Sequence, residues 1–163
     1  MNIRRAEEKD TNKILDLLSQ VLELHAAIRP DTFIPGTTKY SREELKSMFC
    51  DEQRRIYVAA DEKDSVLGYA FCEIRHQPPR DNMVQFRSLY IDDLCVLDEF
   101  QGQGIGSKLC DFIFDYGNKN GFDYITLNVW SGNESAISFY ENKGFSIRNI
   151  HMEKRIGDLN EEN

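Results

Sequence analysis

Apolar residues recur along the chain with two different periods, which predict alternating helices and strands. Spacing of three or four residues predicts helices at residues 11–29, 41–50, 105–121 and 133–142. Short apolar or alternating runs predict strands at residues 2–6, 56–60, 66–74, 83–96 and 124–129, with one or two more within 145–156. Loops rich in proline or polar residues separate these elements.

The order of the predicted elements is β-α-α-β-β-β-α-β-α-β-β. Antiparallel hairpins come first and a β-α-β crossover follows, so we expect an α+β fold with a mixed sheet. A chain of 163 residues without an evident linker or repeat is expected to form one domain. We assign residues 1–157 to this domain and the polar residues 158–163 to a tail.

A glycine-dense turn joins the longest predicted strand to the third helix. Gly102, Gly104 and Gly106 lie within five positions and leave bare backbone at the start of that helix. Unpaired N–H groups and the positive end of the helix dipole both attract anions there. The turn therefore predicts a site for a ligand that carries phosphate.

Spacing separates three known kinds of phosphate-binding turn. A P-loop requires Gly-Lys-Ser/Thr, but Gly106 precedes Ser107 and Lys108 in the wrong order. A dinucleotide-binding turn requires a third glycine where this chain has Ser107. The pattern Gln/Arg-x-x-Gly-x-Gly/Ala fits residues 101–106 at every fixed position.

With this turn, the chain resembles the GCN5-related N-acetyltransferase (GNAT) family. Residues 133–145, N-x-x-A-x-x-F-Y-x-x-x-G-F, resemble the family's second cofactor-binding segment, and the order of elements over residues 2–156 is similar. The resemblance implies one GNAT-like domain with a mixed sheet of six to seven strands, about four helices and a splayed central strand pair. Gln101 replaces the commoner arginine and removes one charge from the phosphate site.

The resemblance implies acetyl-CoA as the acetyl donor and no metal. The backbone that would hold its pyrophosphate comprises Gln101, Gly102, Gln103, Gly104, Ile105, Gly106 and Ser107. The strand residues Leu94, Cys95 and Val96 would pair with the pantetheine arm, and an amide near Cys95 would polarise the acetyl carbonyl. A bulge in this strand would splay it from residues 125–127. Asn133 would hydrogen-bond the pantetheine or phosphate region.

Tyr140 is the candidate general acid, because a phenol at this family position can donate a proton to the departing sulfur. Its alternative role is packing beside Phe139 and Phe145. No histidine pairs evidently with Cys95, so we expect direct transfer without an acyl-enzyme.

Three carboxylates are candidates for receiving the acceptor amine's proton: Asp93, Glu73 and Asp92. Asp92 and Asp93 are neighbours on one strand, so we expect their side chains on opposite faces of the sheet, with only one in the slot. Each carboxylate could instead face solvent or pair with a nearby arginine.

The paired acidic residues resemble those of acetyltransferases that act on polyamines or aminoglycosides, and so favour a small cationic amine as acceptor. A protein N-terminal or lysine amine is the alternative, since residues 152–155 resemble ribosomal-protein-type acetyltransferases. A non-catalytic acyl-CoA sensor is the alternative of another class. His25 and residues 29–33 fall where the family builds an acceptor-side loop, while Trp130 is expected to pack beside the split strands.

Net charge and composition limit the classes of partner that we expect for this chain. The net charge of −8 and the lack of a basic stripe argue against nucleic acid and suit a cationic acceptor. No apolar run is long enough for a membrane span, and the four widely spaced cysteines fit a reducing cytoplasm. The family resemblance also allows a homodimer.

Overall fold

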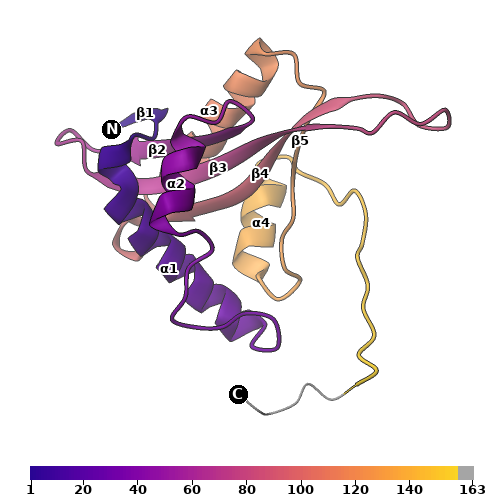
Figure 1. The fold of residues 1–163 in the computed structure, drawn as a ribbon, viewed down its shortest axis with the longest axis horizontal. Coiled ribbons are helices and arrows are strands. Elements are labelled where there is room, and N and C mark those ends of the chain that lie inside the picture. The colour runs from indigo at the N-terminus through magenta and orange to yellow at the C-terminus, as the bar shows by residue number, and fades with distance from the viewer. Residues whose placement is uncertain (158–163) are drawn as a thin grey trace.

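The computed structural model describes residues 1–157, so the predicted tail at 158–163 lies outside the described residues. Its core is a sheet of five strands in the order β1-β2-β3-β4-β5 (Figure 1). The strands are β1 (Asn2–Arg5), β2 (Arg54–Ala60), β3 (Val66–His76), β4 (Arg87–Val96) and β5 (Tyr124–Leu127). All neighbours are antiparallel except β4 and β5, which run parallel. The predicted α+β class is confirmed.

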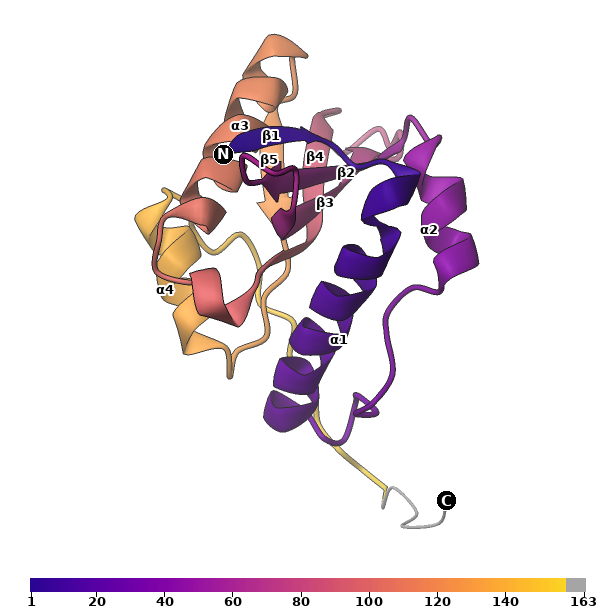
Figure 2. The same cartoon turned by 90° about the vertical axis from the view of Figure 1, so that its left-hand side faces the viewer.

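Helices cover both faces of this sheet. They are α1 (Thr11–Ile28), α2 (Arg42–Phe49), α3 (Ile105–Lys119) and α4 (Glu134–Asn142), with short 3-10 turns at Glu8–Asp10 and Asp98–Phe100. Figure 2 shows α1 and α2 on one side of the sheet, and α3 and α4 on the other. The helix count and the crossover through α3 agree with the sequence pattern.

Each face has its own apolar core. Under α1 and α2 the buried side chains include Ile14, Leu17, Leu18, Leu45, Ile56, Val58, Tyr69 and Phe71. Under α3 they include Tyr57, Ala70, Cys72, Leu89, Ile91, Leu109 and Ile113. Residues of one strand alternate between these two sets, as the two-residue period of a strand requires.

Capping side chains fix two helix starts where the sequence predicts them. Ser41 Oγ accepts the Glu44 N–H (3.3 Å), and the Glu44 carboxylate accepts the Ser41 N–H (2.7 Å). This reciprocal pair is a capping box, which satisfies amides that the helix leaves free. Asn133 Oδ1 accepts the Ala136 N–H (3.1 Å) at the start of α4.

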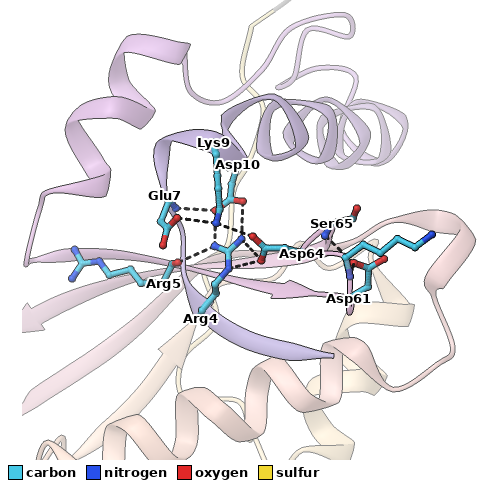
Figure 3. A network of polar contacts seen from close by, with 9 residues as sticks. Arg4, Arg5, Glu7, Lys9, Asp10, Asp61, Asp64 and Ser65 are labelled. Atoms are coloured by element: carbon cyan, nitrogen blue, oxygen red, sulfur yellow. Dashed lines mark hydrogen bonds and ion pairs between the residues drawn. The ribbon is translucent and has the colours of Figure 1, made fainter.

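A polar network ties the N-terminal strand to the rest of the sheet (Figure 3). The Arg4 guanidinium donates to both oxygens of Asp10 (2.7 and 2.9 Å) and to Asp64 (2.9 Å) in the β2–β3 turn. Burial alone would raise the pKa of Asp10, but hydrogen bonds from Arg4 and from the Glu7 N–H lower it. The network therefore joins β1, the start of α1 and the turn after β2 through ionised groups.

Two strand predictions are corrected. The sheet has five strands among the described residues, where six to seven are predicted, because residues 145–156 are extended without being part of the sheet. β4 also begins at Arg87 rather than at residue 83. In both segments the apolar pattern is present, but a strand also requires a neighbour that supplies hydrogen bonds.

Candidate functional site

An extra residue in β4 sets the geometry of the central sheet. Phe71 of β3 faces Asp93, while the next residue, Cys72, faces Ile91. Asp92 therefore has no counterpart on β3, which defines a β-bulge. The expected bulge is therefore present in this strand, but two residues before the 94–96 segment in which the sequence analysis places it.

Beyond this bulge, β4 and β5 separate. Their parallel pairing runs from Ser88↔Tyr124 to Ile91↔Leu127 and stops there. Residues 93–96 of β4 continue to pair with β3, because Asp93 to Val96 stay in register with Phe71 to Gly68. The splayed strand pair that the family resemblance implies is confirmed.

The bulge also corrects the expected orientation of the two carboxylates. Asp92 Oδ2 accepts hydrogen bonds from Tyr40 Oη and Lys39 Nζ (both 2.8 Å), and Asp93 Oδ2 accepts one from Tyr69 Oη (2.9 Å). Tyr40 and Tyr69 both pack on the Phe71 ring, at 5.4 and 4.9 Å. Both carboxylates thus lie on the face covered by α1 and α2, since an extra residue breaks the alternation of faces.

These two carboxylates differ in their electrostatics. Burial raises the pKa of Asp93 to about 6, against the opposing effects of the nearby Lys39 charge and the Tyr69 hydrogen bond. Asp92 forms an ion pair with Lys39. Asp93 can therefore exchange a proton near neutral pH, while Asp92 already holds a cation.

Glu73 lies on the same strand as Phe71 but has a different partner. Its carboxylate accepts two hydrogen bonds from the Arg75 guanidinium (2.7 and 2.9 Å), and that guanidinium stacks 3.4 Å from the Tyr90 ring centre. No hydrogen bond among the described residues joins Glu73 to the Asp92–Asp93 pair. Of these two carboxylates, Asp93 is the one whose pKa burial raises, while Glu73 is held in an ion pair with Arg75.

The glycine turn presents a row of free amides. Gly102 and Gly104 have φ of +73° and +77°, the left-handed region that glycine adopts without strain. Within residues 1–157, the N–H groups of residues 102–107 have no protein hydrogen-bond partner. Gln101 and Gln103 brace the turn by donating to Asp98 Oδ1 (2.8 Å) and the Glu99 carbonyl (3.2 Å). This arrangement fits an anionic group at the start of α3.

The open edge of β4 offers peptide groups next to that turn. The Leu97 N–H donates to the Leu67 carbonyl on β3 (2.9 Å). Because alternate residues of an antiparallel strand direct their peptide groups to opposite edges, Leu94 and Val96 direct theirs toward the gap beside β5. Gln20 of α1 already donates to the Val96 carbonyl (2.9 Å).

Cys95 is a poor candidate for a nucleophile. Its side chain is buried, and burial raises the pKa of the thiol to about 12. A thiol must ionise to attack a thioester, so this environment disfavours a covalent route.

Tyr140 lies on α4 in an aromatic setting on the opposite face of the sheet. Its ring is 5.1 Å from Phe139 and 5.5 Å from Phe145. Burial, assisted by nearby Cys110 and Asp93, raises the pKa of Tyr140 well above its usual value. The phenol therefore carries its proton at neutral pH, as a general acid must. Phe139 also closes on the glycine turn, since a Cβ at Gly106 would lie 3.5 Å from its ring.

A second aromatic cluster lies at the far end of α1. His25 packs on Phe33 (5.2 Å), Phe33 packs edge-on to Trp130 (5.4 Å), and the Arg29 guanidinium stacks on Trp130 (5.1 Å). Burial lowers the pKa of His25, with a further effect from Lys39. Trp130 therefore packs against the loop after α1, just past the end of β5.

Sequence reasoning missed Lys39, Tyr40, Tyr69 and Gln20, which hold the residues around the bulge. Tyr69 had a signal, because an aromatic hydroxyl in the middle of a buried strand requires a polar partner. Tyr40 and Lys39 had none, since they lie in a loop whose path depends on the tertiary fold.

The sequence matches the model of a known protein family. The model of the acetyltransferase (GNAT) family matches residues 20–145. The chain belongs to this family. It is thus an N-acetyltransferase, and members of the family use acetyl-CoA as the acetyl donor.

Individual relatives agree with this assignment. The uncharacterized N-acetyltransferase YhfO of Bacillus subtilis is 26% identical over 146 residues, 89% of each chain. N-alpha-acetyltransferase 50 of Danio rerio is 35% identical over 85 residues, which cover 52% of this chain and 47% of that protein. The crystal structure of a tetramutant of BH1408 from Bacillus halodurans has a TM-score of 0.91 and 29% identity, covering 96% of this chain and all (100%) of that one.

The described residues contain neither a helix that could span a membrane nor a cluster that could bind a metal ion. None of their helices combines the length and apolar character needed to cross a membrane. Their His, Cys, Asp and Glu side chains form no group of three or more that could hold a metal ion.

The Tyr69 hydrogen bond predicts how Asp93 titrates. Tyr69→Phe should raise the pKa of Asp93 further above about 6, by up to about one unit, because the carboxylate loses a donor that stabilises its charged form. NMR titration of the aspartate carboxyl carbons measures this shift. Tyr57→Phe is the control, since Tyr57 lies in the other core. An unchanged Asp93 titration in Tyr69→Phe would contradict the assigned contact.

Proposed function

We propose that this N-acetyltransferase transfers acetyl from acetyl-CoA directly to a primary amine of a small cationic acceptor, of the polyamine or aminoglycoside kind. The observation that carries the proposal is the pairing of Asp92 and Asp93 on one face, next to the splay of β4 and β5. Two carboxylates attract a cationic amine, and one of them can accept its proton.

The donor half of the site rests on backbone groups. The free amides of residues 102–107 fit the pyrophosphate of acetyl-CoA, since they are unpaired donors at the positive end of α3. The outward peptide groups of Leu94 and the N–H of Val96 fit the amides of the pantetheine arm. Asn133 uses its oxygen to cap α4, which leaves its side-chain NH₂ available as a donor.

Acetyl-CoA supplies an acetyl group activated as a thioester. Asp93 accepts the proton that the acceptor ammonium loses, while Asp92 stabilises the remaining positive charge of the acceptor. The amine nitrogen then forms its bond to the acetyl carbon, and the carbon–sulfur bond breaks. Tyr140, which burial keeps protonated, donates its phenolic proton to the departing sulfur, and the second proton that the nitrogen loses as the amide forms restores the phenol.

A protein N-terminal amine is the second candidate acceptor. It is favoured by the 35% identity to N-alpha-acetyltransferase 50 of Danio rerio over 85 residues. That match covers 52% of this chain and 47% of the relative, so about half of each chain lies outside it.

An amine panel tests the proposed acceptor. With acetyl-CoA as donor and thiol release measured with DTNB, spermidine or kanamycin should exceed a peptide N-terminus and N-acetyl-lysine amide by at least about tenfold in kcat/KM. Asp92→Asn should reduce this advantage, because the acceptor loses a charged partner. Asp81→Asn, on an exposed turn, is the control. Preference for the peptide would support the second candidate, and acetyl-CoA binding without any turnover would indicate a sensor.

Gly104 tests the donor site. Gly104→Val should weaken acetyl-CoA binding at least about tenfold in calorimetry, because valine at φ +77° strains the turn and shields its amides. Gly36→Val is a matched control, since Gly36 has φ +75° and equally open surroundings but lies in another loop. Normal binding by Gly104→Val would place the pyrophosphate elsewhere.

Tyr140 tests the acid. Tyr140→Phe should lower kcat by roughly ten- to a thousandfold and leave the Kd for acetyl-CoA unchanged, because only proton donation is removed. Tyr57→Phe is the control, since Tyr57 is also packed among aromatic rings with a pKa raised by burial, to about 12. Unchanged turnover in Tyr140→Phe would exclude this tyrosine as the acid.

A further inference from the structure

Lys39 places a primary amine of the chain itself at the bulge in β4. Its Nζ lies 2.8 Å from Asp92 Oδ2, 3.5 Å from the Asp92 carbonyl oxygen and 5.5 Å from the centre of the Tyr40 ring. Burial is the main influence on the pKa of Asp93 and of His25, and the Lys39 charge lowers both, so the ammonium lies close to each. An ammonium group thus already lies on the two carboxylates that would bind the proposed acceptor.

The Lys39 amine is also near the part of β4 that would hold the thioester. Asp92 precedes Leu94 by two residues, which corresponds to about 7 Å along a strand. The Lys39 side chain is 40% exposed and has a flexible four-carbon stem, so bond rotation can move its nitrogen over several ångströms. A reaction within one molecule gains greatly from such proximity, because no encounter of two molecules is required.

Position, rather than ion pairing or exposure, distinguishes Lys39 from the other lysines. Lys46 on α2 is its closest match among the described residues, since its Nζ lies 2.8 Å from the Glu8 carboxylate and its side chain is 51% exposed. Glu8 belongs to the 3-10 turn before α1, away from the bulge. If exposure and an acidic neighbour alone decided reaction with a thioester, Lys46 would react at least as fast as Lys39.

We propose that Lys39 is a site of self-acetylation, to which the protein transfers acetyl from acetyl-CoA. The step rests on the proposed function, because it uses the same donor, Asp93 and Tyr140. The Lys39 ammonium gives one proton to Asp93, and its nitrogen forms a bond to the acetyl carbon as the carbon–sulfur bond breaks. The nitrogen loses a second proton as the amide forms, and the sulfur gains one through Tyr140, so CoA leaves as a thiol.

This modification changes the charge of the acceptor site. An amide nitrogen carries no positive charge, so acetyl-lysine cannot form the ion pair that Lys39 forms with Asp92. The modified protein therefore presents Asp92 to an acceptor without the cation that holds it in the unmodified chain.

Peptide mass spectrometry of the full chain, incubated with acetyl-CoA and no added amine, tests the proposal. Acetyl should accumulate at Lys39 at least about tenfold faster than at Lys46, with a first-order rate constant that does not depend on protein concentration. Tyr140→Phe should slow acetylation of Lys39 and of spermidine by the same factor, because both use one proton donor. Equal rates at Lys39 and Lys46, a rate constant that rises with protein concentration, or different factors in Tyr140→Phe would each overturn the proposal.

Added spermidine separates the self-acetylation from the proposed function. At about ten times its KM it should slow initial acetylation of Lys39 roughly tenfold, because it binds the same carboxylates. Turnover of spermidine without acetyl at Lys39, or without this protection, would overturn self-acetylation and leave the proposed acceptor in place. Acetylation of Lys39 without turnover of any added amine would support self-acetylation and contradict the proposed acceptor. Transfer to neither would overturn both.

Discussion

Two parallel strands that stop pairing halfway determine what this molecule can bind. β4 and β5 share hydrogen bonds only up to Ile91 and Leu127, while β3 keeps the rest of β4 in place. The second half of β4 therefore has no strand beside it on the β5 side, inside an otherwise continuous sheet. The amide turn before α3 lies at the end of this strand, so one interruption of the ladder places a backbone surface and an anion site in line.

The sequence was most informative where function depends on local backbone geometry. Helix caps at Ser41 and Asn133 and the glycine turn at residues 102–106 are read directly from residue type and spacing, because a few neighbouring residues determine each. The orientation of Asp92 and Asp93 could not be read this way. A bulge is a mismatch between two strands, and neither strand alone contains that information.

The strands predicted at residues 145–156 are absent from the described sheet for a related reason. Residues 145–156 have the right alternation for strands, and periodicity reports which face is to be buried but not what will bury it. Lys39 and Tyr40, which contact Asp92, come from the loop between α1 and α2, so their place at the bulge depends on how these helices pack on the sheet. Long-range placement of this kind leaves little trace in the spacing of residues.

The extra residue in β4 affects the gap beside β5 more than it affects the packing of the two cores. Side chains before Asp92 and those after Asp93 would keep their faces if the strand were one residue shorter, because both aspartates lie on the same side. Such a shorter β4 would match β3 residue for residue, with Ile91 and Cys95 still in their separate cores. It would also tend to run on beside β5 and close the gap. The presence of one extra residue in β4, rather than the identity of any side chain, thus distinguishes a sheet that is open between β4 and β5 from a closed one.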